Sequence, residues 1–223
     1  MSLPFPGGIA ATPNGLLLLS LIAAIIYGLS DRRQPSWRRS VAKTAAVGLL
    51  AALSFVERGP LMLTAALALG AGGDAALAQR GERAFLVGLG AFLLAHLAYV
   101  WLFATHWQGW EIAAREPWRI ALGLALLALC AFMVVRLRPA VGGALGLPVA
   151  AYTAAILAMG LAALLVPGWG VPAGAVLFIV SDTLLAARKF LLSPQAASDP
   201  RLGWAVWGFY YLAQALIALT LLT

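Results

Sequence analysis

The sequence predicts an all-α membrane protein, a single bundle of eight transmembrane helices joined by short loops. Hydrophobic residues make up 63% of the 223 residues and charged residues only 10%, whereas a soluble domain carries about 25% charged residues. The mean hydropathy is +0.93. Several apolar stretches approach the ~20 residues that a helix needs to cross ~30 Å of hydrocarbon. These stretches are rich in alanine and leucine and lack the two-residue alternation of a membrane β-strand.

Eight apolar stretches give the expected spans in chain order: residues 15–30, 40–56, 60–79, 83–104, 117–138, 145–166, 171–192 and 203–222. No basic segment of the kind found in a cleaved signal peptide precedes the first stretch, so we expect it to be a retained span. Pro60, Pro117 and Pro172 stand at or near span starts, where a missing N–H costs little. The loops are too short for a soluble domain, so we expect one domain over residues 1–223.

Basic residues are distributed unevenly between the two sides that these spans define. Twelve of the fifteen lie in or beside the first, third, fifth and seventh loops, and only Arg58, Arg115 and Arg119 lie on the other side. The positive-inside rule places the richer side in the cytoplasm, which predicts that both termini lie outside. Topology and attraction to lipid headgroups explain the net charge of +7, so we expect no nucleic-acid partner.

Two aspartates stand inside predicted spans, while the other six acidic residues lie in or beside loops. Asp74 is about five residues from the cytoplasmic end of its span, or ~8 Å along a helix. Asp182 is about ten residues from that end of its own span. An ionised group at the centre of a membrane helix costs roughly 2.5–3.5 kcal/mol, so such groups normally face the bundle interior or a wet cavity. We interpret both as functional, the alternative being a structural role in joining helices.

Further polar side chains are expected between the membrane centre and its cytoplasmic edge. This layer contains Lys43, Tyr152, Tyr210, Tyr211 and Gln214. His96 and Tyr99 share one face of their span, in its middle to outer half. Lys189 follows Asp182 by two turns on nearly the same face. Facing one another, these groups would line a polar pocket open to the cytosolic leaflet. Each also has a plainer explanation: snorkelling or headgroup anchoring for the lysines, packing for the tyrosines and a satisfied core position for the histidine.

Established catalytic templates fit this sequence poorly. Its only histidines and cysteine are His96, His106 and Cys130, which excludes a three-histidine zinc site and any cysteine-pair metal site. Ser181 adjoins Asp182, but neighbours on a helix point about 100° apart, so we do not expect a serine nucleophile served by that aspartate. A carboxylate pair with one histidine remains. Such a pair suits acid–base chemistry, because burial helps to keep one carboxyl group protonated.

Several motifs occur together and in order along the chain. They are Gly73-Asp74 near the end of a span, the span Phe85–Phe103 with His96 and Tyr99, the segment LGLPVAAY ending at Tyr152, the Ser181-Asp182 span Gly174–Phe190, and the last span Tyr210–Leu219 with Gln214. In this joint pattern the chain resembles the YhhN-like family of integral membrane lysoplasmalogenases. Two positions depart from the family pattern. Thr44 follows Lys43 where proline is common, and Arg188 stands where asparagine is common.

The resemblance implies hydrolysis of the vinyl ether bond of lysoplasmalogens, which gives a long-chain aldehyde and glycerophosphoethanolamine or glycerophosphocholine. The reaction needs an acid to protonate the β-carbon, an anion to stabilise the oxocarbenium-like cation and a base for water. We expect Asp182, the deeper carboxyl group, to be the acid. We expect Asp74 to stabilise the cation or activate water, with help from His96, although these two aspartates could exchange roles.

The remaining candidates are expected to bind substrate. Lys43 and Lys189 would hold the phosphate, while Tyr99, Tyr152, Ser181, Tyr210, Tyr211 and Gln214 would position substrate and water. We expect no cofactor and no metal, and the partners are the lysophospholipid and the surrounding membrane lipids. The alanine, leucine and arginine content suggests a bacterial inner membrane.

Two alternatives remain open. In a proton-coupled transporter or lipid-binding membrane protein, Asp74 and Asp182 would carry protons or pair with a cationic solute. In a structural membrane protein, they would only join helices.

Overall fold

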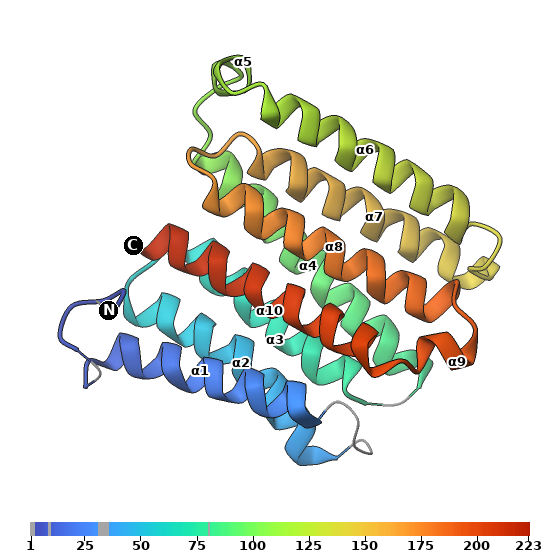
Figure 1. The fold of residues 1–223 in the computed structure, drawn as a ribbon, viewed down its shortest axis with the longest axis horizontal. Helices are drawn as coiled ribbons and strands as arrows, with labels where there is room; N and C mark the ends of the chain where they lie inside the picture. Colours follow the sequence, from blue (N-terminus) through green and yellow to red (C-terminus); the bar gives the residue numbers. More distant parts are fainter. Residues whose placement is uncertain (1–2, 9, 31–35, 80) are drawn as a thin grey trace. The chain divides into compact units, whose positions relative to one another are not determined.

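The computed structural model describes residues 3–8, 10–30, 36–79 and 81–223 of the chain. Regular structure within these ranges is entirely α-helical (Figure 1). The helices are α1 (Thr12–Ser30), α2 (Trp37–Val56), α3 (Leu61–Leu77), α4 (Glu82–Thr105), α5 (Glu111–Arg115), α6 (Trp118–Leu137), α7 (Gly143–Ala163), α8 (Gly170–Phe190), α9 (Pro194–Ala197) and α10 (Pro200–Leu222).

The eight long helices coincide with the eight predicted spans. Seven of those in the described ranges are long and apolar enough to cross a membrane. The eighth, α3, is apolar but has only 17 residues, at the lower end of the ~17–25 that span a bilayer. The predicted fold class is confirmed, and the chain is a multi-pass integral membrane protein.

Two short helices occupy segments that the sequence analysis assigned to loops. α5 is a single turn between α4 and α6, and α9 is a single turn between α8 and α10. At the start of α9 the Ser193 hydroxyl accepts a hydrogen bond from the Ala196 N–H at 3.4 Å, and Pro194 takes the first helical position. Serine at an N-cap followed by proline is a recognised start signal, so this turn was encoded in the sequence.

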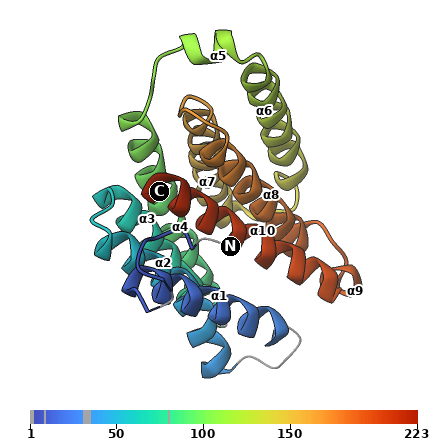
Figure 2. The same cartoon turned by 60° about the vertical axis from the view of Figure 1, so that its left-hand side comes forward.

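The chain divides into two compact units, residues 1–99 with 214–223 and residues 100–213. In the first unit, α1 packs against α2 and α2 against α3 (Figure 2). Glycines bring α3 close to the part of α4 that belongs to the first unit. A Cβ added at Gly73 would lie 2.7 Å from the Phe92 ring, and one at Gly88 would lie 2.7 Å from Leu77. Small residues permit such close approach between membrane helices.

In the second unit, α6, α7 and α8 pack in chain order. Gly160 of α7 lies where a Cβ would be 2.6 Å from Ile179 of α8 and 3.2 Å from Leu126 of α6. The α7–α8 turn is held by Arg119, whose guanidinium donates to the carbonyls of residues 164, 166 and 168 at 2.7–2.9 Å. Arg119 is 1% exposed, and these carbonyls, together with the Glu116 carboxylate 3.0 Å from Nε, satisfy a buried charge that would otherwise be costly.

Candidate functional site

The first of the two membrane aspartates is held in an ion pair. Lys43 Nζ of α2 lies 2.9 Å from Asp74 Oδ1 of α3, and the two side chains are 15% and 1% exposed. The ring of Tyr27 from α1 also faces this lysine, with Nζ 5.7 Å from the ring centroid. A buried carboxylate needs a charged or hydrogen-bonding partner, and Lys43 provides it. The arrangement therefore holds an anion in the interior of the first unit.

The turn between α2 and α3 explains why these two residues meet. Lys43 stands thirteen residues before the end of α2, and Asp74 stands thirteen residues after the start of α3. The helices are antiparallel neighbours, so equal distances from the turn give equal heights. The turn itself is tight, because a Cβ at Gly59 would lie 2.5 Å from Leu222 and 3.0 Å from the Ser54 hydroxyl. A side chain at Gly59 would have to displace these neighbours.

His96 lies on α4 in the same unit. Its side chain is fully buried, and Nδ1 lies 2.6 Å from the Phe92 carbonyl one turn earlier. The Phe92 ring occupies the space beside Gly73, the residue before Asp74. The Gly-Asp motif therefore combines a close helix contact with a buried charge, and the helix that makes this contact also carries His96.

Tyr99 and Gln214 are paired with each other. The Tyr99 hydroxyl on α4 donates to Oε1 of Gln214 on α10, and both side chains are fully buried. Both residues were predicted to bind substrate. The observed contact gives each a polar partner, and it links helices that are far apart in the chain.

Asp182, the second membrane aspartate, lies in the second unit. The Tyr152 hydroxyl of α7 donates a hydrogen bond to Asp182 Oδ2 of α8. Both residues are partly buried. A carboxyl group accepts such a bond whether or not it is ionised, so this contact suits either charge state. In these two contacts Asp74 faces a cation, whereas Asp182 accepts from a phenol hydroxyl.

Three other candidates, Ser181, Tyr210 and Tyr211, lie on α8 and α10, and two of them join these helices. The Ser181 hydroxyl is buried and donates to the Val206 carbonyl at 2.9 Å. The Tyr210 ring meets the Phe178 ring of α8, with centroids 5.4 Å apart, and within α10 the Trp207 ring contacts both Tyr210 and Tyr211. The Ser181 hydrogen bond and the Phe178–Tyr210 ring contact hold α10 against α8 within the second unit.

The predicted site residues thus fall into two groups. Lys43, Asp74, His96, Tyr99 and Gln214 belong to the first unit, and Tyr152, Ser181, Asp182, Lys189, Tyr210 and Tyr211 belong to the second. Lys189 is exposed near the end of α8, with Nζ 5.6 Å from the Phe190 ring centroid. A single pocket formed by both groups stays a prediction. Among the described residues, no three His, Cys, Asp or Glu side chains are grouped to hold a metal ion.

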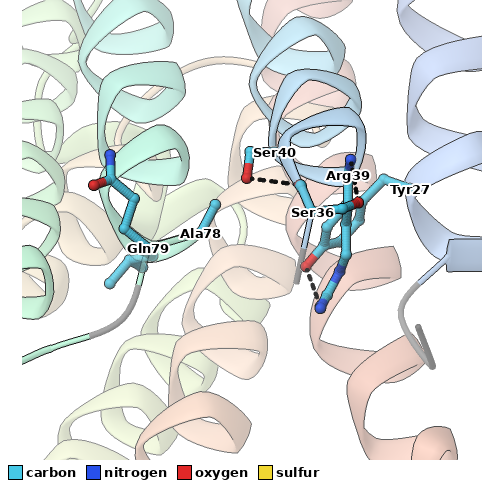
Figure 3. A pocket seen from close by; sticks show the side chains of 7 residues that line it. Tyr27, Ser36, Arg39, Ser40, Ala78 and Gln79 are labelled. Carbon is cyan, nitrogen blue, oxygen red and sulfur yellow. Dashed lines mark hydrogen bonds between the residues drawn. The ribbon is translucent and has the colours of Figure 1, made fainter. Parts of the chain in front are cut away.

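A cavity that the sequence analysis missed lies at the end of the first unit where α2 begins. Its volume is about 160 Å³, and α1, α2 and α3 all contribute to its lining (Figure 3). Arg39 Nη2 donates to the Tyr27 hydroxyl at its edge, at 3.3 Å. From the sequence alone, Arg39 was expected only to be one of the basic residues that set the topology. Its spacing of four residues before Lys43, which places both on one helix face, was the available signal.

Comparison with known proteins gives a consistent result. The YhhN family profile matches residues 38–221. A protein of Mycobacterium tuberculosis named lysoplasmalogenase is 34% identical over 188 residues, covering 82% of this chain and 68% of its own length. Proteins named lysoplasmalogenase TMEM86B from Sus scrofa and Rattus norvegicus are 35% and 34% identical, covering 84% and 91% of this chain and 76% and 82% of their own lengths. No solved structure matches the chain.

Proposed function

This chain belongs to the YhhN family, and from that premise we propose that it is a lysoplasmalogenase, a membrane hydrolase acting on vinyl ether bonds. Its substrates would be lysoplasmenylethanolamine and lysoplasmenylcholine. The products would be a fatty aldehyde and glycerophosphoethanolamine or glycerophosphocholine.

The proposed reaction consumes one water molecule. An acid transfers a proton to the β-carbon of the vinyl ether, and the double-bond electrons form the new C–H bond. The α-carbon is left as an oxocarbenium ion, which water attacks while a base removes a proton. The resulting hemiacetal collapses by breaking its bond to the glycerol oxygen, which takes a proton as the aldehyde leaves. Acid, anion and base are the groups that this reaction requires.

The observation that carries this proposal is the difference between the two aspartates. Asp74 faces a lysine at 2.9 Å, which supports a permanent anion that stabilises the oxocarbenium ion or activates water. Asp182 accepts a hydrogen bond from the Tyr152 hydroxyl, a contact open to both charge states, and its greater depth in its span supports the role of general acid. Two carboxyl groups in different surroundings are a common solution to acid–base chemistry at one pH.

The other residues keep their proposed roles with one change. Lys43 was expected to bind phosphate, but its ion pair favours a role in holding the Asp74 carboxylate. Lys189 remains a candidate for phosphate, and His96 for assisting Asp74. Tyr99, Tyr152, Ser181, Tyr210, Tyr211 and Gln214 remain candidates for positioning substrate, water or the aspartates.

The test is aldehyde release from lysoplasmenylethanolamine by the purified protein in lipid nanodiscs. Asp74→Asn and Asp182→Asn should each lower the rate by about 10²–10⁴-fold, the range for losing a general acid or base, while their melting curves show a folded protein. Glu111→Gln, at a carboxylate that is 80% exposed, is the matched control and should retain the full rate. Full rates in both aspartate variants would contradict the mechanism, and reversible loss of activity with a chelator would contradict the expectation that no metal is needed.

Failure of the wild-type protein to release aldehyde would favour transport, in which the same aspartates carry protons. We further propose that the protein lies in a bacterial inner membrane with both termini outside. A reporter enzyme that is active only outside the cytoplasm, fused after Thr223, should then be active, and an inactive fusion would reverse the orientation.

A further inference from the structure

The cavity at the start of α2 is too small for a whole lysolipid. Its volume is about 160 Å³, whereas sites that enclose a drug-sized ligand measure roughly 300–1,000 Å³. Seven residues line it, namely Tyr27, Ser36, Arg39, Ser40, Leu77, Ala78 and Gln79. An occupant of this size is a small polar group, such as one end of a larger molecule.

The chemistry of the lining favours an anion. Five of the seven residues carry polar side chains, and Arg39 brings a full positive charge (Figure 3). A guanidinium group binds phosphate oxygens with paired N–H donors, and the Ser36 hydroxyl and the Gln79 amide add further donors. The first turn of α2, which begins at Trp37, adds the partial positive charge of a helix N-terminus.

A chain of contacts leads from this cavity to Asp74. The Arg39 guanidinium carbon lies 5.2 Å from the centroid of the Tyr27 ring, and Lys43 Nζ lies 5.7 Å from the same centroid. Lys43 in turn pairs with Asp74 at 2.9 Å. One aromatic ring therefore contacts both the cation of the cavity and the cation that faces the buried aspartate.

We propose that this cavity binds the phosphodiester of the lysolipid headgroup, with Arg39 as its principal phosphate ligand and the hydrocarbon chain outside it. This inference rests on the proposed function, since it names the part of the substrate that the first unit holds. Because the Tyr27 ring and hydroxyl orient the arginine, little side-chain freedom is lost on binding. Arg39 acts in substrate binding, while Lys43 serves Asp74.

The test measures binding without turnover. The probe is a lysophosphoethanolamine with a saturated alkyl ether chain, which has no vinyl ether to cleave, and the comparison probe is the matching 1-alkylglycerol without phosphate. Arg39→Gln should weaken binding of the phosphate-containing probe about tenfold to a hundredfold, the range for losing a charged hydrogen bond, and leave the alkylglycerol unchanged. Arg38→Gln is the matched control, because Arg38 is exposed on the same helix and lies outside the lining. It should change neither affinity.

A second pair of variants tests the cavity without touching the arginine. Ala78→Leu places a larger side chain on the lining, whereas Ala76→Leu adds the same bulk one half-turn away, outside the lining. Only Ala78→Leu should weaken binding of the phosphate-containing probe.

Equal effects of Arg39→Gln and Arg38→Gln on affinity would overturn the proposal. So would a loss of affinity in Arg39→Gln that is equal for the two probes. Inorganic phosphate distinguishes the two sources of the anion. If its binding depends on Arg39 while binding of the lysolipid does not, the cavity takes free phosphate and the headgroup assignment is wrong. If the wild type binds the probe through Arg39 but releases no aldehyde from the vinyl ether, the proposed hydrolysis fails while the headgroup site stands.

Discussion

Replacing Lys43 by methionine keeps most of the length of the side chain but removes the charge that faces Asp74. The carboxylate is 1% exposed, so water does not compensate for the loss. Two unit charges 2.9 Å apart attract by about 6 kcal/mol at an effective dielectric constant of about 20. Part of that energy offsets desolvation, and removing one partner of a buried pair typically costs about 3–5 kcal/mol. We expect Lys43→Met to lower the free energy of unfolding by that amount.

Replacing the other partner, Asp74, should lower the free energy of unfolding by less. In Asp74→Asn the remaining charge belongs to Lys43, which is 15% exposed and lies two turns from the start of α2. A long lysine side chain can extend its ammonium toward the end of the helix. We expect a loss of about 1–2 kcal/mol, similar to that of one hydrogen bond. The double variant should recover part of the Lys43→Met loss, with a coupling energy of about 2–3 kcal/mol.

The measurement is unfolding in mixed micelles with increasing denaturing detergent, followed by the fluorescence of the eight tryptophans. Arg38→Met, which removes an exposed cation from the same helix, is the control and should leave the transition unchanged. A Lys43→Met transition equal to that of the control would refute the reasoning. Simple additivity in the double variant would also refute it, because independent side chains do not couple.

Three further changes follow from other contacts. Tyr152→Phe removes the hydrogen bond to the carboxyl group of α8 and should lower kcat for aldehyde release about tenfold with little change in KM; an unchanged kcat would contradict this. Gly73→Ala should destabilise the fold by about 1–3 kcal/mol, because the new Cβ would meet an aromatic ring at 2.7 Å. A Cβ added at Gly72 has no neighbour within 4 Å, so Gly72→Ala should have no effect in the same unfolding assay. Arg119→Met leaves three carbonyls without their donor and should cost about 3 kcal/mol or more, while Arg115→Met, at an exposed position, should leave the transition unchanged.

The eight long helices were predictable because membrane spans are set by length and apolar composition. The two short helices were harder, since a single turn such as α5 is too short to show hydrophobic periodicity. The α9 turn was missed although Ser193-Pro194 carries its start signal. Composition therefore predicts the spans, while the turns between them depend on local capping.

The contact between Lys43 and Asp74 was partly predictable. Their equal distances from the α2–α3 turn follow from the sequence once the turn is placed. Their mutual orientation does not, because apolar residues occupy every side of these helices and leave the rotation about each axis unspecified. The same uncertainty hides the pairing of Tyr99 with Gln214, which are 115 residues apart. Long-range pairs of this kind depend on helix packing, which a single sequence does not encode in its periodicity.

The length of α3 has a consequence for the lipid around it. At the helical rise, its 17 residues extend about 25 Å, against about 36 Å for the 24 residues of α4. A bilayer responds to a span shorter than its hydrocarbon thickness by thinning locally. Such hydrophobic mismatch brings the headgroups nearer to the ends of α3, one of which carries Asp74 in its last turn. Bilayer thickness is then a physical variable that acts on this carboxylate.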